Sequence, residues 1–176
     1  TPPVFVATIP PVAMLLEPIV AGRAEVVTIL PAGASPHTYS PRPTDAAAAE
    51  RALTVVMVGE ALDGWAARLA GNRTPLRLTD LLPVSERLLF DEGDHDHDHA
   101  EDGHVHEAGA VDPHFWTDPV ATETIIGPLV AALSELDPDG APVYAANAEA
   151  LRRELERLDA ELHARLDPVR GRAAVL

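Results

Sequence analysis

Residues 4–21, VFVATIPPVAMLLEPIVA, contain a short buried strand followed by a helix. The first four are apolar and mostly β-branched or aromatic, which is typical of a strand inside a sheet. Pro10 and Pro11 suit the first turn of a helix, and Gly22 ends the apolar helical pattern after Ala21. This stretch therefore predicts one strand–helix step of an α/β domain.

The same alternation continues through the first half of the chain. We expect strands at residues 26–30, 53–58 and 75–78, a helix over residues 45–50 with Thr44 as its cap, and a helix over residues 62–70. Alternation at this spacing predicts a parallel sheet with helices on both faces. Ligands of such sheets bind beyond the carboxyl ends of the strands, which is where the loop that carries His37 begins.

The second half is predicted to be mainly helical. Residues 83–113 show no regular pattern, whereas Asp118 and Pro119 open a helix that runs to about residue 136. A longer helix over about residues 141–166 carries a stripe of leucines at positions 151, 155, 158, 162 and 166. At 1.5 Å per residue that helix spans roughly 39 Å, which is more than a lobe of this size needs for itself.

Composition excludes several classes of partner. The net charge is −15, from 28 acidic residues and 13 arginines, so nucleic acid and anionic membrane surfaces are poor partners whereas cations are attracted. There is no cysteine, which excludes thiolate metal sites and disulfides. No apolar run approaches the roughly 20 residues of a membrane span, so we expect no membrane insertion. We find no signal peptide and expect any exported protein to be in its processed form.

Five of the eight histidines lie in an acidic segment, residues 91–107, called here the His-rich segment. They are His95, His97, His99, His104 and His106. Neutral imidazole suits zinc, copper or nickel, and the eight carboxylates of the segment add charge and oxygen donors. We expect weak metal capture in several geometries, because ordering such a segment costs entropy. The alternative is a solvated linker whose histidines have no role.

Two further histidines lie in proline-bounded motifs, PHTYSP around His37 and DPHFWTDP around His114. Rigid loops of this kind hold imidazoles in fixed directions, as a tight metal site requires. Either histidine alone is more often a surface or core residue, but together, with the His-rich segment between them, they favour a shared site. Zn–N bonds of about 2.0–2.1 Å place two ligand nitrogens roughly 3.3 Å apart. Asp112 could support a ligand imidazole by a hydrogen bond, or could equally cap a turn.

These motifs, in this order, resemble the metal-ligand signatures of the zinc- and manganese-binding solute-binding proteins of ABC importers (cluster A-I). Residues 6–8, residues 59–65 and the long helix resemble further parts of that family. The resemblance implies two α/β lobes joined by one long helix, with the metal between them. It implies that His37 and His114 are ligands from the first lobe, while a histidine or glutamate and an aspartate come from a second lobe.

The resemblance also implies a domain plan. We expect a metal-binding α/β lobe at residues 1–137, an interlobe helix at residues 138–168 and the start of a truncated second lobe at residues 169–176.

The implied function is that of a periplasmic, high-affinity receptor that delivers zinc to an ABC permease. The His-rich segment resembles the zinc branch, although more carboxylate ligands would favour manganese. The alternatives are a manganese- or iron-specific member, or a periplasmic zinc buffer or chaperone that works through the His-rich segment. We expect no enzyme activity, because no motif supplies both an open coordination position and a general base, as a metal-dependent hydrolase requires.

Overall fold

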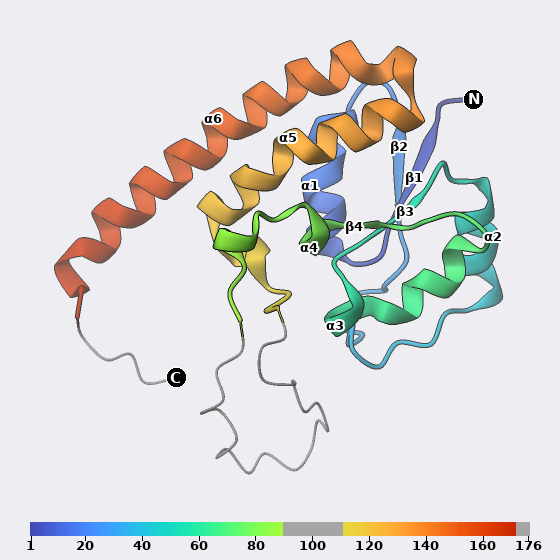
Figure 1. Ribbon diagram of the computed structural model, residues 1–176, viewed down its shortest axis with the longest axis horizontal. Coiled ribbons are helices and arrows are strands. Elements are labelled where there is room, and N and C mark those ends of the chain that lie inside the picture. The colour runs from blue at the N-terminus through green and yellow to red at the C-terminus, as the bar shows by residue number, and fades with distance from the viewer. Residues whose placement is uncertain (90–110, 172–176) are drawn as a thin grey trace, which may run out of the picture.

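Four parallel strands form the centre of the protein, whose structure is a computed structural model that describes residues 1–89 and 111–171 (Figure 1). The strands are β1 (Val4–Ala7), β2 (Glu25–Thr28), β3 (Val55–Met57) and β4 (Leu76–Arg77), in the spatial order β2-β1-β3-β4. Val6 of β1 pairs with Val27 on one side and with Val55 on the other, both in parallel. The predicted parallel sheet is therefore confirmed, with strands slightly shorter than expected.

Helices cover both faces of this sheet, as predicted. The helical elements are α1 (Pro10–Val20), α2 (Pro43–Arg51), α3 (Glu60–Asp63), η1 (Gly64–Ala70), α4 (Leu78–Leu81), η2 (Val84–Glu86), η4 (Phe115–Thr117), α5 (Pro119–Leu136), η5 (Pro138–Gly140), α6 (Ala141–Leu166) and η6 (Asp167–Val169). On one face α1 packs on β1 and β2 and is itself covered by α6, which lies against α5. On the other face α2 packs on β1 and η1 packs on β3.

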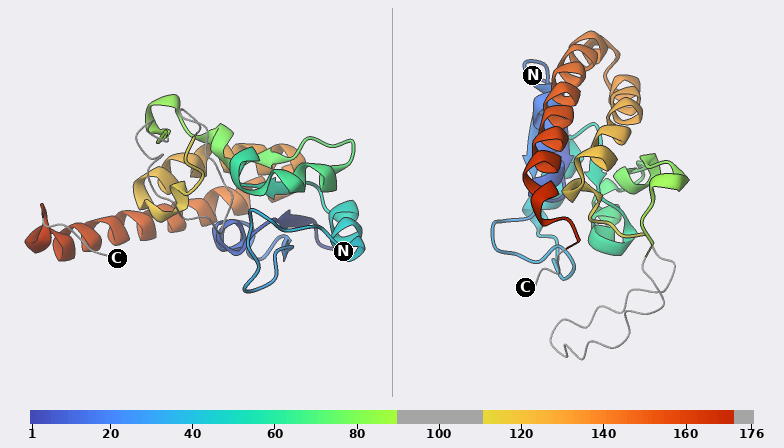
Figure 2. Two further views of the ribbon diagram at one scale, coloured as in Figure 1. Left: turned by 90° about the horizontal axis from the view of Figure 1, so that it is seen from below. Right: turned by 90° about the vertical axis from the view of Figure 1, so that its left-hand side faces the viewer.

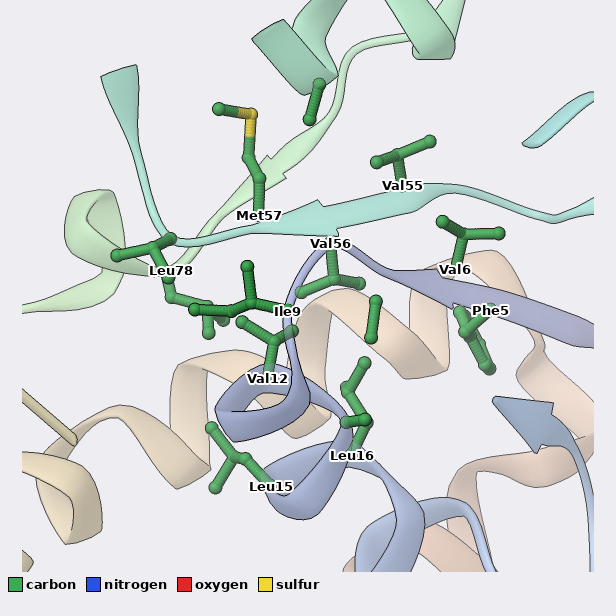
Figure 3. Packing of buried hydrophobic residues seen from close by; sticks show 14 of the residues in the cluster. Phe5, Val6, Ile9, Val12, Leu15, Leu16, Val55, Val56, Met57 and Leu78 are labelled. Carbon is green, nitrogen blue, oxygen red and sulfur yellow. The ribbon is translucent and has the colours of Figure 1, made fainter. Parts of the chain in front are cut away.

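Alternate side chains of the strands fill two apolar layers, because successive residues of a strand point to opposite faces. Figure 3 shows Phe5 and Val56 directed towards α1, where Val12 and Leu16 lie, while Met57 points to the opposite face. These residues are at most 1% exposed. The β-branched runs that predicted the strands therefore predicted the core as well.

Two helices begin or end differently from the sequence-based prediction. Helix α2 begins at Pro43, without Thr44 as its cap, because the Asp45 carboxylate accepts a hydrogen bond from the backbone N–H of Arg42 (2.7 Å). The helix expected over residues 62–70 is split into the short α3 and the 3-10 helix η1. Within residues 83–113, thought to lack regular structure, the described part contains η2 and an antiparallel bridge between Leu89 and Val111.

The split at residues 63–64 has a visible cause in the carboxylate of Asp63. That side chain is fully buried and accepts hydrogen bonds from the backbone N–H groups of Val58 and Gly59, both at 2.9 Å. It also accepts one from the hydroxyl of Thr8 at the end of β1, at 2.5 Å. Local patterning favours a continuous helix, but these bonds, of which the one from Thr8 is long-range, hold the chain in a tighter turn.

A polar cluster fixes the corner between α5 and α6. Arg23, in the turn after α1, donates to Asp137 through Nε (2.7 Å) and through Nη2. The hydroxyl of Tyr144 donates to the same carboxylate at 2.6 Å. Gly140 is required there, because a Cβ at this position would collide with both Asp137 and Tyr144. The cluster therefore joins α1 to the start of α6 and sets the direction in which α6 leaves the sheet.

The end of α6 extends beyond the sheet and beyond α5 (Figures 1 and 2). Its apolar side chains there are largely uncovered, with Leu158 44% exposed and Leu166 58% exposed. A shallow depression between this end and the start of α5 is lined by Pro119, Leu162 and Val169, among others. In the part of the chain that the structure describes, no helix combines the length and apolarity needed to cross a membrane.

The Asp137 cluster predicts a pH-dependent stability. The hydrogen bond from Arg23 lowers the pKa of Asp137 to about 2. Because this pKa lies below the unfolded value, the contribution is present above that value and is lost as the pH falls towards the folded pKa. We expect Asp137→Asn to lower the free energy of unfolding by about 1.5–3 kcal/mol near neutral pH. The difference from the wild type should shrink as the pH falls from about 4 to about 2. Urea unfolding at several pH values measures it.

The matched control is Asp139→Asn on the same turn. Asp139 is 91% exposed and lies 3.9 Å from Arg23, so its loss should cost less than about 0.5 kcal/mol. An equal effect of the two substitutions would contradict the assignment of the effect to the buried carboxylate.

The uncovered end of α6 predicts self-association of this chain at high concentration, because exposed apolar surfaces of this kind are interaction sites. Replacing Leu158 and Leu166 together by glutamine should abolish it. Met14→Gln serves as the control, since Met14 is 73% exposed on α1. Sedimentation equilibrium measures the association, and a strictly monomeric wild-type chain would contradict the prediction.

Candidate metal centre

His37 lies in the loop from β2 to α2, which begins at the carboxyl edge of the sheet. Backbone hydrogen bonds from Ile29 to Ala7 (2.9 Å) and from Leu30 to Thr8 (2.8 Å) continue the strand pairing up to this loop. The loop then crosses the edge of the sheet, and His37 is half-buried within it. The placement predicted from strand order is therefore found.

His114 lies directly before η4 and is oriented by Asp112. Its ring Nδ1 is 2.7 Å from the Oδ1 of Asp112, and its backbone N–H donates to the same oxygen at 2.9 Å. An ionised carboxylate only accepts hydrogen bonds, so the Nδ1 carries a proton, and in the neutral ring the Nε2 then has the free lone pair. A carboxylate that holds an imidazole in this tautomer is typical of the support for a metal ligand. The hydrogen bond anticipated for Asp112 is present.

The segment after His114 is fixed by its own local bonds. The hydroxyl of Thr117 donates to the carbonyl of His114 (2.8 Å), and Asp118 caps α5 by accepting from the N–H of Val120 (2.8 Å). The ring of Trp116 packs edge-on against the imidazole, with 5.3 Å between ring centroids. The proline-bounded motif is therefore a rigid turn at the start of a long helix.

The fold brings the two histidines together. The ring centroids of His37 and His114 are 6.4 Å apart, although the residues come from loops on different parts of the chain. Two imidazoles on one tetrahedral zinc would have centroids roughly 5 Å apart, from the known Zn–N bond length. The observed separation is slightly longer than that value, so the two rings are close neighbours.

Other histidines do not join this pair in the described part of the chain. His163 lies on α6, its side chain is 65% exposed, and its Nδ1 is 3.2 Å from the carboxylate of Asp159. The five histidines of the His-rich segment lie outside the described residues. Within residues 1–89 and 111–171 no group of three or more metal-ligating side chains converges on one point. His37 and His114 are thus the two histidines that lie near each other in the described residues.

Two residues near His37 are placed there by the tertiary structure. The indole of Trp65 donates a hydrogen bond to the carbonyl of Pro36 at 2.7 Å, and the buried Asp63 fixes the turn before it. Nothing in the local sequence pattern links Trp65 to Pro36, because the two are 29 residues apart. The same loop, together with Glu60 and Arg68, lines an open polar depression beside His37.

Comparison with known proteins assigns the family. Residues 5–176 match the model of the family described as the periplasmic zinc-uptake complex component A, ZnuA. The chain belongs to this family. The resemblance drawn from the two histidine motifs is thereby confirmed, and the family is one of metal-binding transport receptors.

Curated relatives carry both zinc and manganese names. The chain is 32% identical to the manganese-binding lipoprotein MntA of Halalkalibacterium halodurans, over 85% of this chain and 45% of that protein. It is also 32% identical to the high-affinity zinc uptake protein ZnuA of Paracoccus denitrificans, over 99% of this chain and 60% of that protein. The chain spans about half the length of the curated relatives that it matches.

Solved structures of the same fold include a crystal structure of ZnuA, with a TM-score of 0.77 and 26% identity over 98% of this chain and 62% of that one. A zinc-bound ZnuA deletion mutant aligns with a TM-score of 0.76 and 28% identity, over 96% of this chain and 60% of that one. FpvC of Pseudomonas aeruginosa in complex with Mn²⁺ aligns with a TM-score of 0.75 and 26% identity, over 94% of this chain and 57% of that one.

The Asp112–His114 bond yields a prediction about zinc affinity. To remove the His-rich segment's own binding, the five histidines of residues 95–106 are first replaced by glutamine, which we call the five-glutamine background. In it, Asp112→Ala should weaken zinc binding by roughly 10- to 100-fold, because supporting groups of this kind contribute that much. Competition with a chromophoric chelator measures the affinity. Asp159→Ala, which removes the carboxylate beside His163, is the control, and equal losses in both variants would contradict the prediction.

Proposed function

We propose that this chain forms the metal-binding amino-terminal lobe of a periplasmic receptor that delivers zinc to an ABC permease. The observation that carries the proposal is the proximity of His37 and His114 at the carboxyl edge of the sheet, where their ring centroids are 6.4 Å apart. In this proposal residues 1–137 form the lobe, residues 138–168 the helix that leads away from it, and residues 169–176 the start of a second lobe.

Each feature of the half-site suits capture of a cation from solution. The imidazoles are half-buried, so they lose little hydration when the ion arrives, and imidazole nitrogen is a common zinc ligand. The chain's net charge of −15 raises the local concentration of cations. Further ligands would come from water, from the His-rich segment or from a second lobe, and a receptor can release its ion when those ligands move away.

Zinc is favoured over manganese by the donors on this chain. Imidazole nitrogen suits zinc, whereas manganese prefers carboxylate and other oxygen donors. The carboxylate of Asp112 points at the imidazole of His114, where it serves as a hydrogen-bond acceptor. Manganese, as in the relative named for it, is the alternative cargo, and it would require oxygen ligands from elsewhere.

A second candidate function is a zinc buffer or chaperone that works through the His-rich segment. The observation in its favour is the concentration of five histidines and eight acidic residues in residues 91–107. Deletion of this segment separates the two functions, because a buffer loses its capacity whereas a receptor keeps binding through His37 and His114. Neither proposal includes a catalytic step.

The test of the receptor proposal uses the five-glutamine background. We expect His37→Ala and His114→Ala each to abolish the remaining specific zinc binding in isothermal titration calorimetry, because a single imidazole cannot hold the ion. In the background itself the affinity should be lost at acid pH, since protonated imidazole cannot bind metal.

His163→Ala is the matched control, because His163 is exposed and its Nδ1 is paired with Asp159 on α6. It should leave zinc affinity unchanged. Retention of specific zinc binding in both the His37 and His114 variants would rule out this site.

A further inference from the structure

We propose that Trp65 is a positioning residue for His37, which sets the metal affinity of the half-site without contacting the ion. The proposal rests on the role of His37 as a metal ligand given above. It explains how an imidazole on a loop without regular structure is held in one direction.

The indole of Trp65 contacts the chain on both sides of His37. Its Nε1 donates to the carbonyl oxygen of Pro36 at 2.7 Å. That carbonyl belongs to the planar peptide unit that joins Pro36 to His37, so fixing the oxygen fixes the orientation of the backbone at His37. The ring of Tyr39, two residues after His37, packs edge-on against the same indole, with 5.0 Å between centroids.

Trp65 is itself held rigidly by the ends of two strands. It is 9% exposed and follows Asp63, whose fully buried carboxylate accepts hydrogen bonds from Thr8 after β1 and from the backbone after β3. Hydrogen bonds therefore join Asp63 to the ends of the strands, and the indole two residues later donates to the loop. The indole is thus a rigid support for the loop.

The far side of the loop has a second anchor. The hydroxyl of Tyr39 donates to the carboxylate of Asp45 (2.8 Å), which also accepts from the N–H of Arg42 at the start of α2. Tyr39 thus joins α2 to the indole, and the loop is held between two fixed elements.

Supporting contacts lie beside both histidines. The imidazole of His114 is held directly, by a hydrogen bond from its own ring to Asp112. His37 is held through its backbone, by contacts of Trp65 with Pro36 and Tyr39. Sites of this kind lose affinity when the supporting groups are removed, because the free ligand samples directions in which it cannot bind.

The alternative is that Trp65 only fills the core beside η1. Both explanations predict that Trp65→Phe lowers thermal stability, since it removes a hydrogen bond and part of a buried ring. Only the positioning role predicts weaker zinc binding by the folded protein. Zinc affinity measured well below the melting temperature therefore separates them.

The experiment compares Trp65→Phe with Tyr144→Phe in the five-glutamine background. Both variants remove one hydrogen-bond donor, but Tyr144 donates to Asp137 at the corner of α5 and α6, away from the pair. We expect roughly 10-fold weaker zinc binding in Trp65→Phe and an unchanged affinity in Tyr144→Phe, by chelator competition.

Ring ¹⁵N chemical shifts give a second readout, because the five-glutamine background retains only His37, His114 and His163. When zinc is added to Trp65→Phe, the ¹⁵N signal of His37 should shift less than in the background, or should broaden. The signal of His114 should still shift. His163 serves as the internal reference.

The outcomes separate this proposal from the one on which it rests. If His37→Ala leaves zinc affinity unchanged, the metal site itself is wrong. If His37→Ala abolishes binding but folded Trp65→Phe binds zinc as tightly as the background, the positioning role is wrong.

If Trp65→Phe fails to fold, Tyr39→Leu tests the same support of the loop. It removes the ring packed against the indole and leaves the indole in place. Weaker zinc binding by the folded Tyr39→Leu protein supports the proposal, and unchanged affinity overturns it.

Discussion

The buried carboxylate of Asp63 is the interaction on which the carboxyl edge of the sheet depends. It joins the end of β1, through Thr8, to the end of β3, through the N–H groups of Val58 and Gly59. Burial raises the pKa of this carboxyl, while the hydrogen bonds that it accepts act in the opposite direction. Such a group is tolerated inside a protein only when its partners are all in place, so it imposes one geometry on the turn that follows.

The turn fixed by Asp63 is linked to the loop that carries His37 through the backbone and through side chains. The turn carries Trp65, the indole contacts Pro36, and the loop presents His37 towards His114. His114 depends on a different support, the carboxylate of Asp112 together with the start of α5. Two separate sets of contacts therefore support the two histidines at one sheet edge. In the proposed metal site, such support would lower the cost of ordering the ligands when the ion binds.

A second polar cluster fixes the direction of the long helix α6. Arg23, Asp137 and Tyr144 join α1 to the corner of α5 and α6, and the first part of α6 packs on both helices. The later part of α6 leaves the sheet with leucines exposed. The chain thus combines a pair of neighbouring histidines with an exposed apolar helix surface.

The sequence alone determined the elements whose signals are local. Prolines at the helix starts and the apolar periodicity placed α5 and α6 at the bounds observed, and β-branched runs located the strands of the core. The two proline-bounded histidine motifs also identified the pair His37 and His114. Each helix, strand and histidine motif depends on residues that are close in the sequence, so a single sequence contains the necessary information.

Only the tertiary structure decided the features that rest on long-range contacts. The helix expected over residues 62–70 became two elements because Asp63 bonds to Thr8, 55 residues away. The support of His37 by Trp65, and the 6.4 Å separation of the two imidazoles, also join distant parts of the chain. Local patterns carry no record of such pairs, because strand order and loop path determine which distant residues meet.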